Sequence, residues 1–187
     1  MPSLSEADQK AILGLARQAV TEAVCQNRKL QQVPNSGIFA TKCGLFVTLH
    51  VAKRLHGCIG VIEGKEALGE NVAHCAMSAA LEDPRFSRMQ LSDLATLEIE
   101  VSLLSPLEPI RPDDVEIGKH GLLMEFGFHR GLLLPQVATE HHLDRKRFLE
   151  ETCYKAGLPK DAWKGPETRI FGFTCEVFAD PGFHAPQ

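Results

Sequence analysis

The same order of strand, strand, helix and strand occurs twice along the chain, and this repetition most constrains the fold. In the first stretch, strand patterns at residues 45–51 and 55–62 precede a helical apolar stripe at 68–83 and an alternating strand at 97–103. In the second stretch, a hairpin at 121–126 and 131–134 precedes a helix at 144–157 and a strand at 171–177. The offset between the two stretches is near the 77 residues that separate Gly44 from Gly121.

We therefore expect an α+β protein with two closely packed subdomains, each a strand-strand-helix-strand unit with a mixed or antiparallel sheet. The halves are expected at approximately residues 38–105 and 118–178, with an amphipathic N-terminal helix at 5–27 packing on them. The 187 residues are close to the length of one domain, and no linker-like tract interrupts them. We therefore expect residues 1–187 to form a single domain.

Composition and charge narrow the function classes. The net charge of −4 offers no global attraction to nucleic acid or to an anionic membrane. The N-terminus lacks a signal-peptide pattern and no apolar run approaches ~18 residues, so we expect a cytoplasmic protein with no membrane partner and six free thiols. No Cys-x-x-Cys occurs, so we expect no structural zinc, no other metal and no cofactor.

Periodicity separates the six cysteines. Three are expected in the core because they lie on apolar helix stripes or an apolar strand face: Cys75, Cys153 and Cys175. Cys25 and Cys43 have no distinguishing neighbours. Cys58 differs, because strand alternation places it on the face opposite the apolar residues Leu55, Ile59 and Val61.

The glycines around Cys58 indicate a close approach. Gly57 and Gly60 remove side-chain bulk, which is usual where a ligand or another backbone comes near. Alternation places His56 on the face of Cys58, within reach of its sulfur, so the two are candidates for a catalytic pair. The alternative is a bulged, glycine-containing strand with a passively packed cysteine.

The turn at residues 52–54 leaves the pairing of this strand open. A three-residue turn would place Thr48 beside Cys58, whereas a two-residue turn would place Val47 there.

Other polar residues are candidate ligand contacts. In Asp83-Pro84-Arg85, the arginine could hold a carboxylate or phosphate, or could form a structural salt bridge that fixes the loop. His120 beside Gly121 and Gln136 at a strand end could bind a ligand, or could only satisfy backbone groups.

Two acidic residues, Glu98 and Glu100, share a strand face and could form an acid and base pair, although a solvated face is the commoner case. A metal site formed by His56, Cys58 and His120 is not required by their spacing.

The segment Leu-His-Gly-Cys-Ile-Gly at 55–60 resembles Leu-Arg-Gly-Cys-Ile-Gly, the hallmark of the AMME-syndrome candidate region domain family. Prokaryotic members of this family are called AmmeMemoRadiSam system protein A. The resemblance continues through Glu-Asp-Pro-Arg-Phe at 82–86, Leu-Glu-Ile-Glu-Val-Ser at 97–102, Arg-Gly-Leu-Leu-Leu-Pro-Gln-Val-Ala-Thr-Glu at 130–140 and Cys-Tyr-Lys-Ala-Gly-Leu-Pro at 153–159.

This resemblance implies an α+β fold with two packed subdomains, and possible partners in a Memo-like protein and a radical SAM protein, but no reaction. His56 stands where the family usually has arginine, so an anion or thiolate held there should depend on pH near neutrality. Two hypotheses follow. One is an enzyme or enzyme component with Cys58 as thiolate, His56 or His120 as base and Arg85 holding an acidic group; the other is a non-catalytic binding module.

Overall fold

The computed structural model describes residues 4–183, which fall into two compact units. The first unit runs up to Leu104 and takes up the chain again from Glu176, and the second unit is Ser105–Cys175. The chain therefore passes from the first unit to the second and returns.

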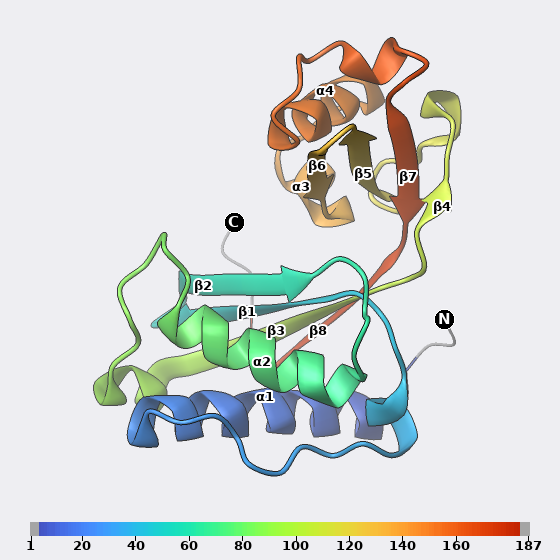
Figure 1. The fold of residues 1–187 in the computed structure, drawn as a ribbon. Coiled ribbons are helices and arrows are strands. Elements are labelled where there is room, and N and C mark those ends of the chain that lie inside the picture. Colours follow the sequence, from blue (N-terminus) through green and yellow to red (C-terminus); the bar gives the residue numbers. More distant parts are fainter. Residues whose placement is uncertain (1–3, 184–187) are drawn as a thin grey trace. The chain divides into compact units, whose positions relative to one another are not determined.

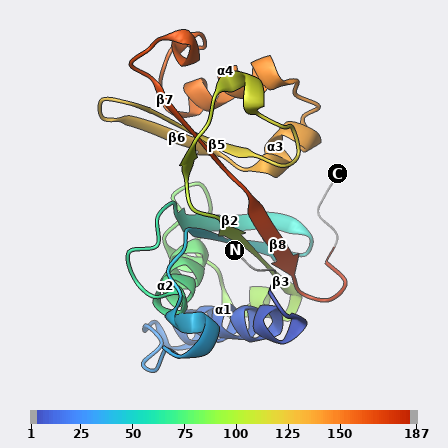
Figure 2. The ribbon, with the colours of Figure 1, turned by 90° about the vertical axis from the view of Figure 1, so that its right-hand side faces the viewer.

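The first unit is a four-stranded sheet with two helices on one face (Figures 1 and 2). The sheet order is β2-β1-β3-β8. The elements are α1 (Glu6–Gln26), β1 (Leu45–Val51), β2 (Arg54–Val61), α2 (Leu68–Leu81), β3 (Leu97–Leu104) and β8 (Cys175–Ala179), with short 3-10 turns at Gly37–Ala40 and Leu91–Thr96.

The helices form where the sequence predicts them. The side chain of Ser5 accepts a hydrogen bond from the amide of Asp8 and caps α1. The apolar stripe of α1 is buried against α2 and β3. The small residues of α2 let it lie close to β1 and β2, and together these elements enclose one apolar core.

The β1–β2 hairpin combines features that the sequence left open. Ala52 and Lys53 both have positive φ and form a two-residue turn. A bulge then inserts His56 between the pairs His50–Leu55 and Leu49–Gly57. The extra residue shifts the register by one, so that Thr48 lies opposite Cys58, as expected only for a three-residue turn.

The second unit repeats the order of the first. Its sheet order is β4-β7-β5-β6, and both β6 and β7 pair antiparallel with β5, as β2 and β3 pair with β1. The elements are β4 (Glu108–Pro109), β5 (Gly121–Phe126), β6 (His129–Leu133), α3 (Pro135–Glu140), α4 (Arg145–Lys155) and β7 (Arg169–Phe173), with 3-10 turns at Pro112–Asp114 and Ala162–Lys164.

In this unit α4 packs on β5 and β6 over a second apolar core, as α2 does in the first unit. The α+β class with repeated strand-strand-helix-strand order is confirmed. The short helix α3 was not predicted.

The single strand expected at 171–177 is wrong. The structure divides this segment into β7 and β8, which belong to different sheets. Thr174 separates them, because its amide donates to Ser105 Oγ (2.9 Å) and its carbonyl accepts from the Ser105 amide (2.9 Å). Because both backbone polar groups of Thr174 bond to Ser105, Thr174 belongs to neither sheet.

All six cysteines are free thiols. Cys75 and Cys153 are buried as predicted, whereas Cys175, also expected in the core, is only partly buried. Cys43, for which the sequence made no prediction of burial, is buried. Among the described helices, none is long and apolar enough to cross a membrane.

Candidate functional site

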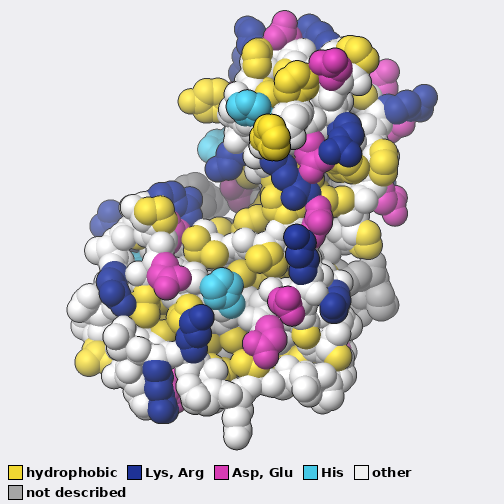
Figure 3. Space-filling model, in the orientation of Figure 1, with side chains coloured by type: hydrophobic (Ala, Val, Ile, Leu, Met, Phe, Trp, Pro, Cys, Tyr) yellow, Lys and Arg dark blue, Asp and Glu magenta, His cyan; other side chains and the backbone are white. Residues whose placement is uncertain are grey.

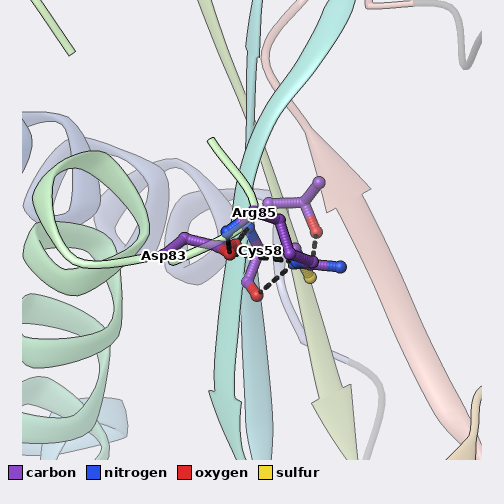
Figure 4. Close-up of polar contacts among 4 residues, drawn as sticks. Cys58, Asp83 and Arg85 are labelled. Carbon is purple, nitrogen blue, oxygen red and sulfur yellow. Dashed lines mark hydrogen bonds and ion pairs between the residues drawn. The ribbon is translucent and has the colours of Figure 1, made fainter. Parts of the chain in front are cut away.

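Cys58 lies on β2, the edge strand of the first sheet, and its two backbone polar groups are held from outside the sheet (Figure 4). The Cys58 amide donates to Asp83 Oδ2 at 2.9 Å, and Arg85 Nη2 donates to the Cys58 carbonyl at 3.0 Å. Asp83 and Arg85 come from the loop that follows α2. We call this arrangement the Asp83–Arg85 clamp.

The clamp is internally bonded as well. Asp83 Oδ1 accepts from the amide and Nε of Arg85 at 3.1 and 3.0 Å, and Oδ2 accepts from Nη2 at 2.7 Å. The Asp83 side chain is 2% exposed, and its hydrogen bonds with Arg85 hold the pKa of this carboxyl well below its usual range. The contacts of Arg85 are those of the structural salt bridge that the sequence offered as one alternative.

The sulfur of Cys58 receives a hydrogen bond from Thr48 Oγ1 at 3.2 Å. Burial raises the pKa of the thiol; the Thr48 hydrogen bond and the charge of Arg85 lower it, while the charges of Asp83 and Glu100 raise it. The net direction is upward, so the thiol form is favoured at neutral pH.

Cys58, Thr48 and Glu100 form one row across β2, β1 and β3, because Thr48 is the register partner of both others. The row lies on the sheet face opposite α1 and α2, since the alternate residues, such as Val47, are buried in the core with those helices. Strand alternation paired Glu100 only with Glu98. It could not select Thr48, because the turn left its pairing open.

The glycines of the motif accommodate neighbouring parts of the chain. A Cβ on Gly57 would collide with the carbonyl oxygen of Ala79 on α2. A Cβ on Gly60 would collide with the carbonyl of Leu45 and the ring of Phe46. For Gly57, close approach of another backbone accounts for the glycine. A ligand-binding role for either glycine stays a prediction.

The bulge at His56 breaks the alternation that predicted its side chain on the face of Cys58. The His56 ring stacks on Phe86 with centroids 6.4 Å apart. Its Nε2 is buried and has no hydrogen-bond partner among residues 4–183. Leu55, expected on the core face, pairs with His50 and is 42% exposed.

His120 and Gln136 belong to the second unit. His120 Nδ1 accepts a hydrogen bond from the Glu116 amide at 3.1 Å, just before β5. Gln136 lies in the first turn of α3, and its Oε1 is buried without a partner in the described part of the chain. Their roles toward a ligand stay predictions.

Among residues 4–183, no three or more His, Cys, Asp and Glu side chains are grouped so that they could hold a metal ion.

Comparison with known proteins identifies relatives along nearly the whole chain. A protein of Methanothermobacter thermautotrophicus is 38% identical over 188 residues, covering 96% of this chain and 97% of the relative. A protein of Methanocella arvoryzae is 44% identical over 151 residues, covering 74% of this chain and 75% of the relative. The crystal structure of an uncharacterized protein from Pyrococcus horikoshii matches with a TM-score of 0.89 at 35% identity, covering 95% of this chain and 94% of that one. Residues 13–178 match the sequence model of the AMMECR1 family, and the chain belongs to that family.

Proposed function

We propose that this protein is an enzyme or enzyme component whose function depends on the thiol of Cys58. The supporting observation is that the Asp83–Arg85 clamp binds both the amide and the carbonyl of this one residue. An edge-strand residue can leave both groups to water, so the clamp is not needed to satisfy them. It fixes the backbone of Cys58 and therefore the direction of its thiol.

The proposed chemistry requires a base. Because burial keeps the pKa of Cys58 above its ordinary value, the thiol must lose its proton before the sulfur can act as a nucleophile. Thr48 Oγ1 then stabilises the thiolate by donating to it. His56 stays the candidate base within the first unit, and the other candidate predicted from sequence, His120, belongs to the second unit.

A non-catalytic binding module is the second candidate, and the raised pKa of Cys58 favours it. A protonated thiol held by the clamp offers a small, weakly polar contact to a ligand or a partner protein. This role does not require the sulfur to react.

We further propose cytoplasmic action with a Memo-like protein and a radical SAM protein. The partners follow from the family resemblance, and the six free thiols agree with a reducing compartment.

Alkylation by iodoacetamide, followed site by site by mass spectrometry across pH, tests the thiol. Cys43 is the control, since it lies in the same unit and burial raises the pKa of its thiol as well. We expect iodoacetamide to alkylate Cys58 faster than Cys43 at neutral pH, because Cys58 is only partly buried and Thr48 donates a hydrogen bond to its sulfur. We also expect Thr48→Val to raise the pH at which Cys58 alkylation reaches half of its maximal rate, because the Thr48 hydrogen bond lowers the pKa of this thiol. Equal alkylation rates for the two thiols would contradict the proposed role of Cys58.

Cys58→Ser separates the two candidates, with Cys25→Ser as an exposed control. If the protein is an enzyme component, the Cys58→Ser variant should still bind the Memo-like protein, as measured by calorimetry. The system of this variant, the Memo-like protein and the radical SAM protein should lose its output. If Cys58→Ser retains both the binding to the Memo-like protein and the output of the system, the binding module is favoured and the enzymatic proposal is contradicted.

A further inference from the structure

A cavity in the first unit lies away from the clamp, between α2 and the segment that follows α1. Its volume is about 280 Å³, and Leu30, Val33, Ala73 and Met77 supply its apolar walls. Ala73 and Met77 are almost fully buried, whereas Leu30 and Val33 are partly buried against the core. These side chains therefore form a fixed apolar floor.

The segment after α1 approaches α2 closely at Gly69, beside the cavity. At the first turn of α2, a Cβ on Gly69 would collide with the carbonyl oxygen of Pro34, so the segment lies directly against the helix there. Farther along α2, small Ala73 faces the cavity and leaves the space between Val33 and Met77 unfilled.

Two carboxylate side chains line the cavity beside its apolar walls. Glu66 precedes α2 and Glu70 lies in its first turn, and both are exposed and line the cavity. Among residues 4–183, neither carboxylate has a hydrogen bond or ion pair, although Lys29 lines the same cavity. The Asn71 side chain donates to the Glu66 carbonyl at 3.1 Å and anchors the backbone that carries one of them.

His74, one helical turn beyond Glu70, completes the polar side of the cavity. Figure 3 shows this surface: over α2, acidic, basic and histidine side chains surround hydrophobic ones. A concave site with an apolar floor weakens the screening of a carboxylate by water, compared with an open surface.

We propose that this cavity binds a small organic cation, a primary ammonium on a short apolar chain. The apolar chain would lie on Met77 and Val33, and the ammonium would bind Glu70 and Glu66. An anion is the weaker match, because two carboxylates oppose the single ammonium of Lys29. This site does not rest on the proposed role of Cys58.

Titration with n-pentylammonium, followed by the backbone amide signals of Ala73 and Met77 in NMR spectra, tests the proposal. 1-Pentanol carries the same chain without charge, and pentanoate carries the opposite charge. We expect n-pentylammonium to bind at least fivefold more tightly than either. Equal binding of pentanol, or tighter binding of pentanoate, would overturn the proposal.

Glu70→Gln keeps the size of the side chain and removes its charge. We expect it to weaken n-pentylammonium at least fivefold and to leave pentanol unchanged. Glu151→Gln on α4 is the matched control, because Glu151 is an exposed helical glutamate of the second unit, and it should change neither affinity by as much as twofold. An unchanged affinity in Glu70→Gln, with a wild-type circular dichroism spectrum, would also reject the site.

Discussion

Replacing Asp83 by alanine should destabilise the first unit, because it removes the central acceptor of the clamp. Asp83 accepts from the Cys58 amide and from three donors of Arg85. The bond from the Cys58 amide to a buried carboxylate contributes about 1.5–3 kcal/mol. The Arg85 side chain is 55% exposed, and water can hydrate it when Asp83 is absent. The ion pair between Asp83 and Arg85 therefore contributes at most about 1 kcal/mol to the free energy of unfolding. We therefore expect Asp83→Ala to lower the free energy of unfolding by about 1.5–4 kcal/mol at pH 7.

The loss should depend on pH with a definite sign. The pKa of Asp83 is lower in the folded protein than the unfolded value of about 3.9. A depressed folded pKa contributes stability above the unfolded pKa, and this contribution is lost as the pH falls toward the folded pKa. The difference between wild type and Asp83→Ala should therefore be constant from pH 7 to about pH 5 and shrink below about pH 4.

Urea denaturation followed by circular dichroism measures this difference, and hydrogen exchange of the Cys58 amide reports the clamp directly. The control is Asp114→Ala, because Asp114 forms a comparable pair with Arg111 in which both side chains are about half exposed or more. The control should leave the urea midpoint nearly unchanged. If Asp83→Ala costs less than about 0.5 kcal/mol and the Cys58 amide stays as protected as in wild type, the clamp does not act as we describe.

Three further predictions concern backbone conformation and use urea midpoints. Gly57→Ala should destabilise by about 1–3 kcal/mol, because its Cβ would collide with the Ala79 carbonyl; a smaller loss would mean that α2 shifts at little cost. Gly14→Ala should instead stabilise by about 0.5–1 kcal/mol, since Gly14 lies within α1 and no atom approaches the new Cβ; a loss would contradict this. Replacing Ala52 by Asn and Lys53 by Gly should stabilise by about 1 kcal/mol, because both residues have positive φ; an unchanged midpoint would show that the turn stores no strain.

Hydrophobic periodicity was sufficient to predict the strand-strand-helix-strand order of each unit, but not the fourth strand of either sheet, β8 or β4. Alternation and helical spacing in the two stretches depend on side-chain burial alone, and both stretches form the expected strand-strand-helix-strand order. The same reasoning failed at Thr174, where the chain leaves one sheet and enters another. The apolar alternation of 171–177 continues through that point, so only the hydrogen bonds with Ser105 mark the break.

The candidate site was harder to predict because its geometry depends on one inserted residue. Without the bulge at His56, the two-residue turn would place Val47 opposite Cys58, and the thiol would share the face that packs on the helices. A bulge carries no periodic signal, so alternation predicted His56 as a neighbour of Cys58, and the turn left Thr48 as one of two possible partners across the hairpin.

The hydrogen bonds of the clamp join residues that are far apart in the sequence, and local sequence patterns do not predict such contacts. Asp83-Pro84-Arg85 and the Cys58 segment were both singled out, yet nothing in either motif predicts a hydrogen bond between Cys58 and Asp83, which are 25 positions apart. What joins them is α2, whose 14 residues span about 21 Å and carry the chain back along the sheet to the edge of β2. The collision at Gly57 shows how closely the end of this helix approaches the strand, since Ala79 lies only four residues before Asp83. A residue with a side chain at position 57 would hold α2 away from β2 and move Asp83 from the Cys58 amide. Gly57 therefore allows the clamp to form, because the absence of a side chain lets α2 approach β2 and place Asp83 beside the Cys58 amide.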